Sequence, residues 1–268
     1  MNTSQVSNEN TLLIKVPIII TLYFWIIKIL ATTVGETGAD FLIFNWNLGL
    51  PATSIVMGVV LAGFLYAQVK TKTYIPWLYW MTVVFVSIVG TLITDNLTDN
   101  LGIPLVASTI AFSVALAVTF WLWYKAEGSL SIHSIYTAKR ELFYWAAILF
   151  TFALGTAAGD LMAESIGLGY ALSALIFGAV IVFITLGFYV IRLNGILAFW
   201  LAYILTRPLG ASIGDYLSQD VADGGLGLGT VGTSVFFLAA IVGLVSYLTI
   251  TRADSQASAA QAAHEHRL

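Results

Sequence analysis

Long apolar runs alternate with short polar or glycine-containing segments along this chain. Most runs have the length, roughly 20 residues, that an α-helix needs to cross the hydrocarbon core of a bilayer. Backbone groups in lipid must form hydrogen bonds within their own element, so these runs predict helices. We place eight helices at residues 12–39, 50–70, 75–98, 103–125, 140–164, 168–191, 195–218 and 229–250.

A short pattern occurs four times and divides the predicted helices into pairs. Each copy starts with an aromatic residue and Trp, has Gly ten residues after the Trp and Asp fifteen residues after it, and ends in a Gly-containing turn. Gly favours a helix end, and Pro favours a first turn. The pattern therefore predicts an all-α integral membrane protein whose eight transmembrane helices form four parallel helical-hairpin repeats. We assign the repeats to residues 12–74, 75–139, 140–194 and 195–252, with a disordered tail at 1–11 and a flexible tail at 253–268.

Composition agrees with a membrane protein and excludes several kinds of site. The 268 residues are 59% hydrophobic and 9% charged, whereas a soluble domain carries about 25% charged residues. The chain has no Cys, which excludes disulfides and thiolate metal sites. It has no phosphate-binding loop and no nucleophile with a nearby His. We therefore expect no enzyme, no resident cofactor and no nucleic-acid partner.

The basic residues predict how the chain is oriented. The turns inside the four pairs contain no Lys or Arg. By the positive-inside rule, both termini are then cytoplasmic, and the aspartates lie towards the outer face. The basic residues at the end of the bundle that holds the termini are Lys70, Lys72, Lys125, Lys139, Arg140, Arg192, Arg252 and Arg267.

One aspartate in each repeat is the strongest functional signal in the sequence. Further acids lie four residues from three of these aspartates. Steps of four residues stay on one face of a helix, and the same face continues with hydroxyl side chains. The predicted cation-binding residues are Glu36, Asp40, Asp95, Asp99, Asp160, Glu164 and Asp215, and the supporting polar stripe is Thr32, Ser87, Thr91 and Thr156.

This polar face should lie in the bundle interior or in water, because a charge at the bilayer centre costs about 2.5 kcal/mol or more. Small residues directly before the aspartates, as in Gly155-x-x-x-Gly159, allow helix backbones to approach closely. Carboxylate and hydroxyl oxygens suit Ca²⁺, Mg²⁺ or Mn²⁺. Adjacent carboxylates also raise one another's proton affinity, which permits exchange of protons for a metal ion. The alternative is that the acids only decorate helix ends, as we expect for Asp220 and Asp223 outside the repeated position.

Two basic residues, Lys28 and Arg207, fall within the predicted membrane interior. They have three possible roles, all concerned with charge pairing or gating. They can pair with the nearby acids, act as an internal tether that competes with a bound cation, or bind an anionic substrate. The sequence does not choose among these roles.

The Trp residues suggest an aromatic belt. Trp80, Trp145 and Trp200 fall in the first turns of predicted helices, where Trp is enriched at membrane interfaces. We therefore expect them to anchor and pack at the interface rather than bind a ligand. Trp77, Trp121 and Trp123 fit the same belt.

The repeated Trp, Gly and Asp positions resemble a bacterial membrane-protein family described as four tandem repeats of unknown function, each with two membrane spans and a characteristic Trp. The resemblance extends from about Leu12 to Arg252 and implies an integral protein of the bacterial inner membrane. Phe44 and Gln219 replace the second acid in the first and fourth copies. The four repeated tryptophans are Trp25, Trp80, Trp145 and Trp200.

The function that we expect is secondary transport of a hard divalent metal cation, with Mn²⁺ or Mg²⁺ favoured over Ca²⁺. The expected partners are this cation, protons that are coupled to its transport, and the lipid bilayer. Two alternatives stay open. The chain could carry a small organic anion on Lys28 and Arg207, or it could be a structural or accessory membrane protein without transport activity.

Overall fold

The computed structural model describes residues 15–17, 20–45 and 49–252. These residues form eight α-helices and no β-strand, as the sequence predicted. Seven of the helices, α3 to α9, are long and apolar enough to cross a membrane, which indicates a multi-pass membrane protein. The helices are α2 (Leu22–Asp40), α3 (Leu50–Lys70), α4 (Pro76–Asp95), α5 (Leu105–Glu127), α6 (Ala138–Asp160), α7 (Tyr170–Val190), α8 (Gly195–Ser218) and α9 (Thr230–Thr251).

The first helix departs from its predicted range of 12–39. It begins at Leu22, and the described residues before it are not helical, while 12–14 and 18–19 lie outside the described residues. Pro17 disfavours a helical backbone at the residue before it. The other seven helices agree with the predicted ranges to within two residues when the short π-helical segments after α4 and α6 are included.

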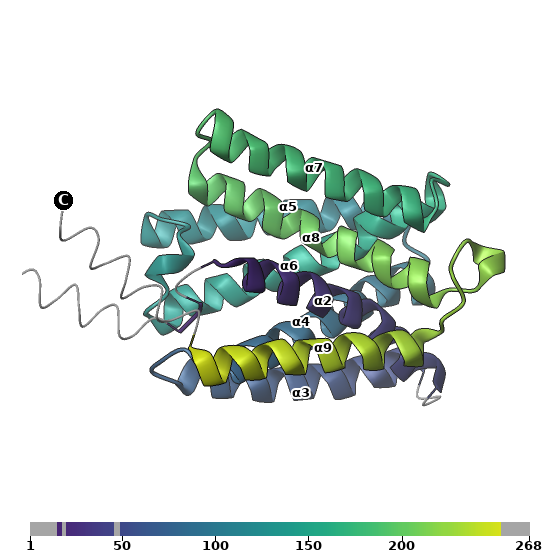
Figure 1. The fold of residues 1–268 in the computed structure, drawn as a ribbon, viewed down its shortest axis with the longest axis horizontal. Helices are drawn as coiled ribbons and strands as arrows, with labels where there is room; N and C mark the ends of the chain where they lie inside the picture. Colours follow the sequence, from purple (N-terminus) through teal and green to yellow (C-terminus); the bar gives the residue numbers. More distant parts are fainter. Residues whose placement is uncertain (1–14, 18–19, 46–48, 253–268) are drawn as a thin grey trace, which may run out of the picture.

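The helices form an inner ring and an outer layer. Each of α2, α4, α6 and α8 packs against two others of this set, so that α2 contacts both α4 and α8 and the ring is closed. Figure 1 shows all eight helices lying roughly along one direction, with α7 at one edge and α3 and α9 at the other. The helices of the inner ring are those that end in the repeated Asp pattern.

The outer helices join neighbouring repeats. Each outer helix packs chiefly on the inner helix of the following repeat: α3 on α4, α5 on α6 and α7 on α8. The last outer helix, α9, packs on α2 and so joins the end of the chain to its beginning. A single repeat therefore cannot bury its apolar surface alone, as in other repeat architectures.

The repeated glycines set the spacing of the inner helices. Each repeated glycine packs against the next inner helix. The residue that it faces there lies seven positions after the Trp of that next helix. A methyl group at any of these glycines would overlap the facing side chain, so the predicted close approach is confirmed. The four contacts are Gly35 with Ser87, Gly90 with Phe152, Gly155 with Arg207 and Gly210 with Thr32.

Three of the repeated Trp residues pack as expected, but inside the bundle and not in an exposed interfacial belt. Trp80, Trp145 and Trp200 are 1%, 4% and 4% exposed. They pack against aromatic side chains of other helices. The ring centres of Trp80 and Phe24 on α2 are 5.4 Å apart, and those of Trp200 and Phe120 on α5 are 4.8 Å apart. Trp123 is also buried, whereas Trp77 and Trp121 are 51% and 59% exposed, as a belt requires.

Candidate cation site

The repeated aspartates lie where the α-helical geometry of the inner helices ends. Asp40, Asp95 and Asp160 are the last α-helical residues of α2, α4 and α6, and each is followed by a π-helical segment of five residues. In the fourth repeat, α8 continues past Asp215 to Ser218. π-helical turns are rare in proteins, and many of those that occur lie at functional sites. No feature of the sequence predicted these segments.

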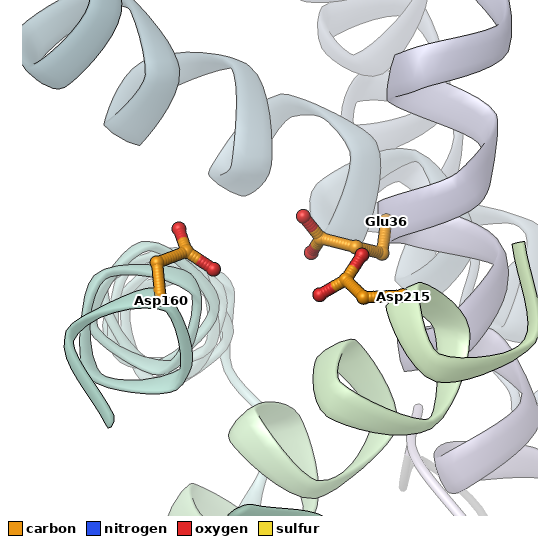
Figure 2. Close-up of side chains that lie close together, drawn as sticks. All are labelled: Glu36, Asp160 and Asp215. Carbon is orange, nitrogen blue, oxygen red and sulfur yellow. The ribbon is translucent and has the colours of Figure 1, made fainter. Parts of the chain in front are cut away.

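Three carboxylates from three inner helices meet in one place. Glu36 on α2, Asp160 on α6 and Asp215 on α8 each contribute one oxygen, and these oxygens lie within 4.8 Å of one another. Figure 2 shows the three side chains directed into the space between their helices. Oxygen ligands lie roughly 2.0–2.6 Å from Mg²⁺ or Ca²⁺, so oxygens at this spacing can share one ion. We call Glu36, Asp160 and Asp215 the acidic triad.

The other predicted acids surround the triad without joining it. Asp40 and Asp95 are partly buried, and Asp40 accepts a hydrogen bond of 3.4 Å from the Gln219 amide. Asp99 and Glu164 are exposed. The seven predicted acids therefore form a buried or partly buried group of five and an exposed pair. The first repeat contributes Glu36 to the triad instead of Asp40.

A layer of hydroxyl groups adjoins Glu36. Glu36, Thr91 and Thr156 occupy the same position in their repeats, eleven residues after the Trp, and the fourth equivalent is Ala211. The Thr91 hydroxyl donates to a Glu36 carboxylate oxygen at 3.4 Å and lies 3.5 Å from the Thr156 hydroxyl. Of the predicted polar stripe, Thr91 and Thr156 thus lie beside the acid.

The remaining two residues of the stripe lie at helix contacts. Thr32 donates to the carbonyl of Ile29 at 2.6 Å and to that of Thr206 at 3.3 Å. Ser87 packs against Gly35. These two residues therefore support the packing of the inner helices.

Arg207 enters this hydroxyl layer from α8. Its side chain is completely buried and forms an ion pair of 2.8 Å with Glu36. The same terminal nitrogen donates to the Thr156 hydroxyl at 2.6 Å and to the Thr91 hydroxyl. Three roles were considered for Arg207, and the structure shows the first of them, pairing with a predicted acid.

Lys28 has a different environment. It is 0% exposed, and its amino group has no hydrogen-bond partner among the described residues. The nitrogen lies 4.2 Å from the ring centres of both Phe152 and Tyr203. Aromatic faces attract a cation, but they accept no conventional hydrogen bond. Pairing with an acid is thus not seen for Lys28.

Aromatic side chains fill the interior on the side of the ring that holds the start of the inner helices. Tyr79, Tyr144 and Tyr203 are each 0% exposed, and the hydroxyls of Tyr79 and Tyr144 are 2.6 Å apart. Phe24 lies 6.4 Å from Tyr203, measured between ring centres. These buried aromatic side chains therefore lie at the end of the inner helices opposite the acids.

One buried ion pair was missed by the sequence reasoning. Glu141, in the first turn of α6, accepts from Lys15 at 2.9 Å and from Gln68 at 3.3 Å. The Trp145 indole nitrogen also donates to it at 3.5 Å. The cluster attaches the segment before α2 to the ends of α3 and α6. A Glu one turn before a repeated Trp was the available signal in the sequence.

Comparison with known proteins finds one family. Its model, Repeat of Unknown Function (DUF347), matches the chain four times in succession, at residues 23–74, 78–129, 143–193 and 198–254. No curated protein and no solved structure matches the chain. The four matches cover most of the chain and confirm the resemblance drawn from the repeated Trp, Gly and Asp. The chain therefore belongs to the DUF347 family, with four tandem copies of the repeat.

Proposed function

We propose that this chain is a membrane-embedded secondary transporter of a hard divalent metal cation, with Mn²⁺ or Mg²⁺ favoured. In this proposal all eight helices span a bacterial inner membrane as four parallel hairpin repeats. Both termini face the cytoplasm, and the acids face the outer side. The energy comes from an ion gradient, with protons as the coupled ion.

The outer surface supports insertion into a membrane. The outer helices expose large apolar side chains, such as Ile55, Phe183 and Phe236, at 69%, 76% and 68%. Extended apolar surfaces of this kind mark membrane or protein contacts. Helix α2 is not among the seven helices that are long and apolar enough to cross a membrane, but Lys28 and Glu36 on it are buried. Its charges therefore face the bundle, where they need not contact lipid.

The acidic triad is the single observation that carries the proposal. Its three oxygens come from three different repeats and lie within 4.8 Å of one another. Oxygen ligands alone favour Mg²⁺, Ca²⁺ or Mn²⁺ over metals that prefer sulfur or nitrogen. The hydroxyl of Thr91 lies next to Glu36 and adds a neutral oxygen ligand to the same region.

The balance of charge also favours a cation. The buried and partly buried acids of this group are Glu36, Asp40, Asp95, Asp160 and Asp215, and the buried bases on the inner helices are Lys28 and Arg207. Five acids and two bases leave an excess of three negative charges when all are ionised. A divalent cation or protons can neutralise this excess, and replacement of one by the other would couple metal transport to protons.

The buried aromatic side chains of the inner helices support a transporter rather than an open channel. The buried side chains of Tyr79, Tyr144 and Tyr203 pack inside the ring at the end opposite the acids. In this proposal they block the passage of a cation towards that end. Release at the other end requires the inner helices to move, as alternating access does in transporters built from repeats.

The experiment that tests the proposal is a binding screen of the purified protein in detergent. Mn²⁺, Mg²⁺, Ca²⁺, Zn²⁺ and citrate would be added while thermal unfolding is followed. A ligand that binds only the folded state raises its stability by about 2.7 kcal/mol at a hundredfold excess over the dissociation constant. We expect Mn²⁺ or Mg²⁺ to stabilise the protein.

Substitutions in the triad and outside it make the screen specific. Asp160→Asn should abolish the stabilisation because it removes a triad carboxylate. Asp223→Asn changes an exposed acid in the loop before α9 and should leave the stabilisation intact. If Asp160→Asn and Asp95→Asn both left metal uptake into proteoliposomes unchanged, the proposal would be wrong.

The second candidate function is a carrier of a small organic anion. The amino group of Lys28, which has no hydrogen-bond partner among the described residues, favours it. Here citrate would stabilise the protein, Arg207→Gln would abolish its transport, and the Asp substitutions would only lower stability. The ion pair between Arg207 and Glu36 weighs against this function because it already satisfies one of the two bases.

The third candidate, a structural or accessory membrane protein, is favoured by the position of Arg207 among the inner helices. It predicts that every substitution in the acidic group lowers thermal stability and that no ligand raises it. The same binding screen separates this candidate from both transporters.

A further inference from the structure

Arg207 joins all four inner helices. From α8 its guanidinium donates to Glu36 on α2, to Thr91 on α4 and to Thr156 on α6. A second terminal nitrogen lies 3.5 Å from the Thr32 carbonyl oxygen on α2. In the other repeats the position of Arg207, seven residues after the Trp, holds an uncharged residue. The charged contact is therefore specific to the fourth repeat and is not part of the pattern that the four repeats share.

The sequence makes room for this guanidinium. One turn beyond Arg207, the fourth repeat has Ala211 where the others have Glu36, Thr91 and Thr156. Ala211 is fully buried and contributes only a methyl group to that layer. The Arg207 head group occupies the same layer and contacts all three polar equivalents. The fourth repeat thus supplies a cation where the other three supply oxygen atoms.

Glu36 belongs to two arrangements at once. One of its oxygens pairs with Arg207 at 2.8 Å, and one lies within 4.8 Å of the oxygens of Asp160 and Asp215. Figure 2 shows the Glu36 carboxylate beside that of Asp215, with both extending to the side on which Asp160 lies. A metal ion bound by the triad would therefore use a carboxylate that the guanidinium already neutralises. Two cations on one carboxylate repel each other, so each weakens the binding of the other.

The hold on Arg207 is incomplete. The Nε atom is buried and has no hydrogen-bond partner among the described residues. A guanidinium with a purely structural role is expected to have its donors satisfied, because an unpaired buried donor is costly. An unsatisfied donor is compatible with a group that exchanges partners.

We propose that Arg207 is a tethered competitor of the transported cation: it neutralises Glu36 in the metal-free protein and must release it when a divalent cation occupies the triad. This inference rests on the proposed function and adds a coupling residue to it. In the metal-free transporter, the positive charge of Arg207 then compensates part of the negative charge of the carboxylates. Cation affinity is set by competition with a charge that belongs to the protein itself.

The sign of one affinity change tests the inference. Mn²⁺ binding to the purified protein in detergent would be measured by calorimetry for the unaltered chain and for Arg207→Gln. Gln keeps the Cβ and Cγ atoms that pack on Gly155 and removes the charge. We expect Arg207→Gln to bind Mn²⁺ at least about tenfold more tightly, because a competing charge close to the ligand is gone. A purely structural tie would give weaker binding.

A matched control and a second variant complete the test. Arg140→Gln removes an Arg–Glu pair, that of Arg140 with Glu127 at 2.7 Å, far from the triad, and should leave Mn²⁺ affinity unchanged. Thr156→Val keeps the charge but removes a hydroxyl that accepts from Arg207. It should tighten Mn²⁺ binding by about threefold, the effect of one hydrogen bond. Thr156→Val decides the question if Arg207→Gln does not fold.

The outcomes separate the two proposals. If the unaltered protein binds Mn²⁺ and both variants bind it equally or more weakly, the competitor role is wrong and the proposed transport function stands. If the unaltered protein binds none of the divalent cations, the proposed function is wrong and the competitor role falls with it.

Discussion

Gly210 on α8 lies directly against Thr32 on α2, and this contact closes the ring of inner helices between the last repeat and the first. The side-chain oxygen and Cβ of Thr32 fill the space that a methyl group on Gly210 would need. Thr32 also donates to the carbonyl of Thr206 on α8 at 3.3 Å. The absence of a side chain at one position therefore allows the two ends of the repeat array to meet.

Gly210→Ala is expected to destabilise the protein by about 1–3 kcal/mol, because an added methyl group forces tightly packed helices apart. The measurement is thermal unfolding in detergent. The matched control is Gly63→Ala on α3, where a methyl group would meet nothing within 4 Å. That change should be neutral or stabilising by up to about 1 kcal/mol, since Ala favours helix more than Gly does. Equal effects at both sites would contradict the account of the ring.

Lys28→Met is expected to stabilise the protein. The Lys28 nitrogen is buried without a hydrogen-bond partner among the described residues, and Met replaces it with an apolar group of similar length. The expected gain is about 1–3 kcal/mol in the free energy of unfolding, the cost of an unsatisfied buried polar group.

The control for Lys28→Met is Lys125→Met at the exposed end of α5, which should change stability little. The comparison uses the midpoints of thermal unfolding of both variants in the same detergent. A clear loss of stability in Lys28→Met would show that the amino group has a favourable partner in the folded protein.

Tyr79→Phe should destabilise the protein by about 1–3 kcal/mol, because it leaves the buried Tyr144 hydroxyl without its partner at 2.6 Å. The double variant Tyr79→Phe with Tyr144→Phe removes both hydroxyls and should recover most of this loss. A double-mutant cycle on unfolding free energies measures the coupling. Strictly additive losses would mean that the two hydroxyls do not interact.

Metal binding should weaken as the pH falls. Protons and a metal ion compete for the same carboxylates of the triad, so cation binding releases protons. Calorimetry in two buffers with different ionisation enthalpies counts the protons released for each Mn²⁺ bound. A count of zero, together with an affinity that does not depend on pH, would contradict proton coupling at this site.

Helix positions were readable from the sequence because they depend on local properties. An apolar run of membrane-spanning length, bounded by a turn such as the one at Gly49 and Pro51, determines a helix whatever surrounds it, and α3 occupies the predicted range of 50–70. The repeat was equally readable, since equivalent positions keep equal spacing from each Trp. Glycine at these spacings correctly indicated where backbones approach.

The membership of the triad was decided by the tertiary structure. The sequence favoured Asp40 as a core residue of the site and Glu36, four residues before it on the same face, as an assisting one. Of the two, only Glu36 meets Asp160 and Asp215. Which acid points to the axis depends on the rotation and tilt of α2 in the ring. Those quantities follow from packing against α4, α8 and α9. The burial of Trp80, Trp145 and Trp200 has the same origin, because their rings pack against aromatic side chains of other helices.

Local sequence patterns could not predict the partner of Arg207. Arg207 and Glu36 are 171 positions apart, and they meet only because the fourth inner helix packs against the first. The sequence by itself determined the helices, their fourfold repetition and the residue types available to a site. The closed order of the ring decided which of those residues touch, because contacts between distant repeats depend on how all the helices pack together.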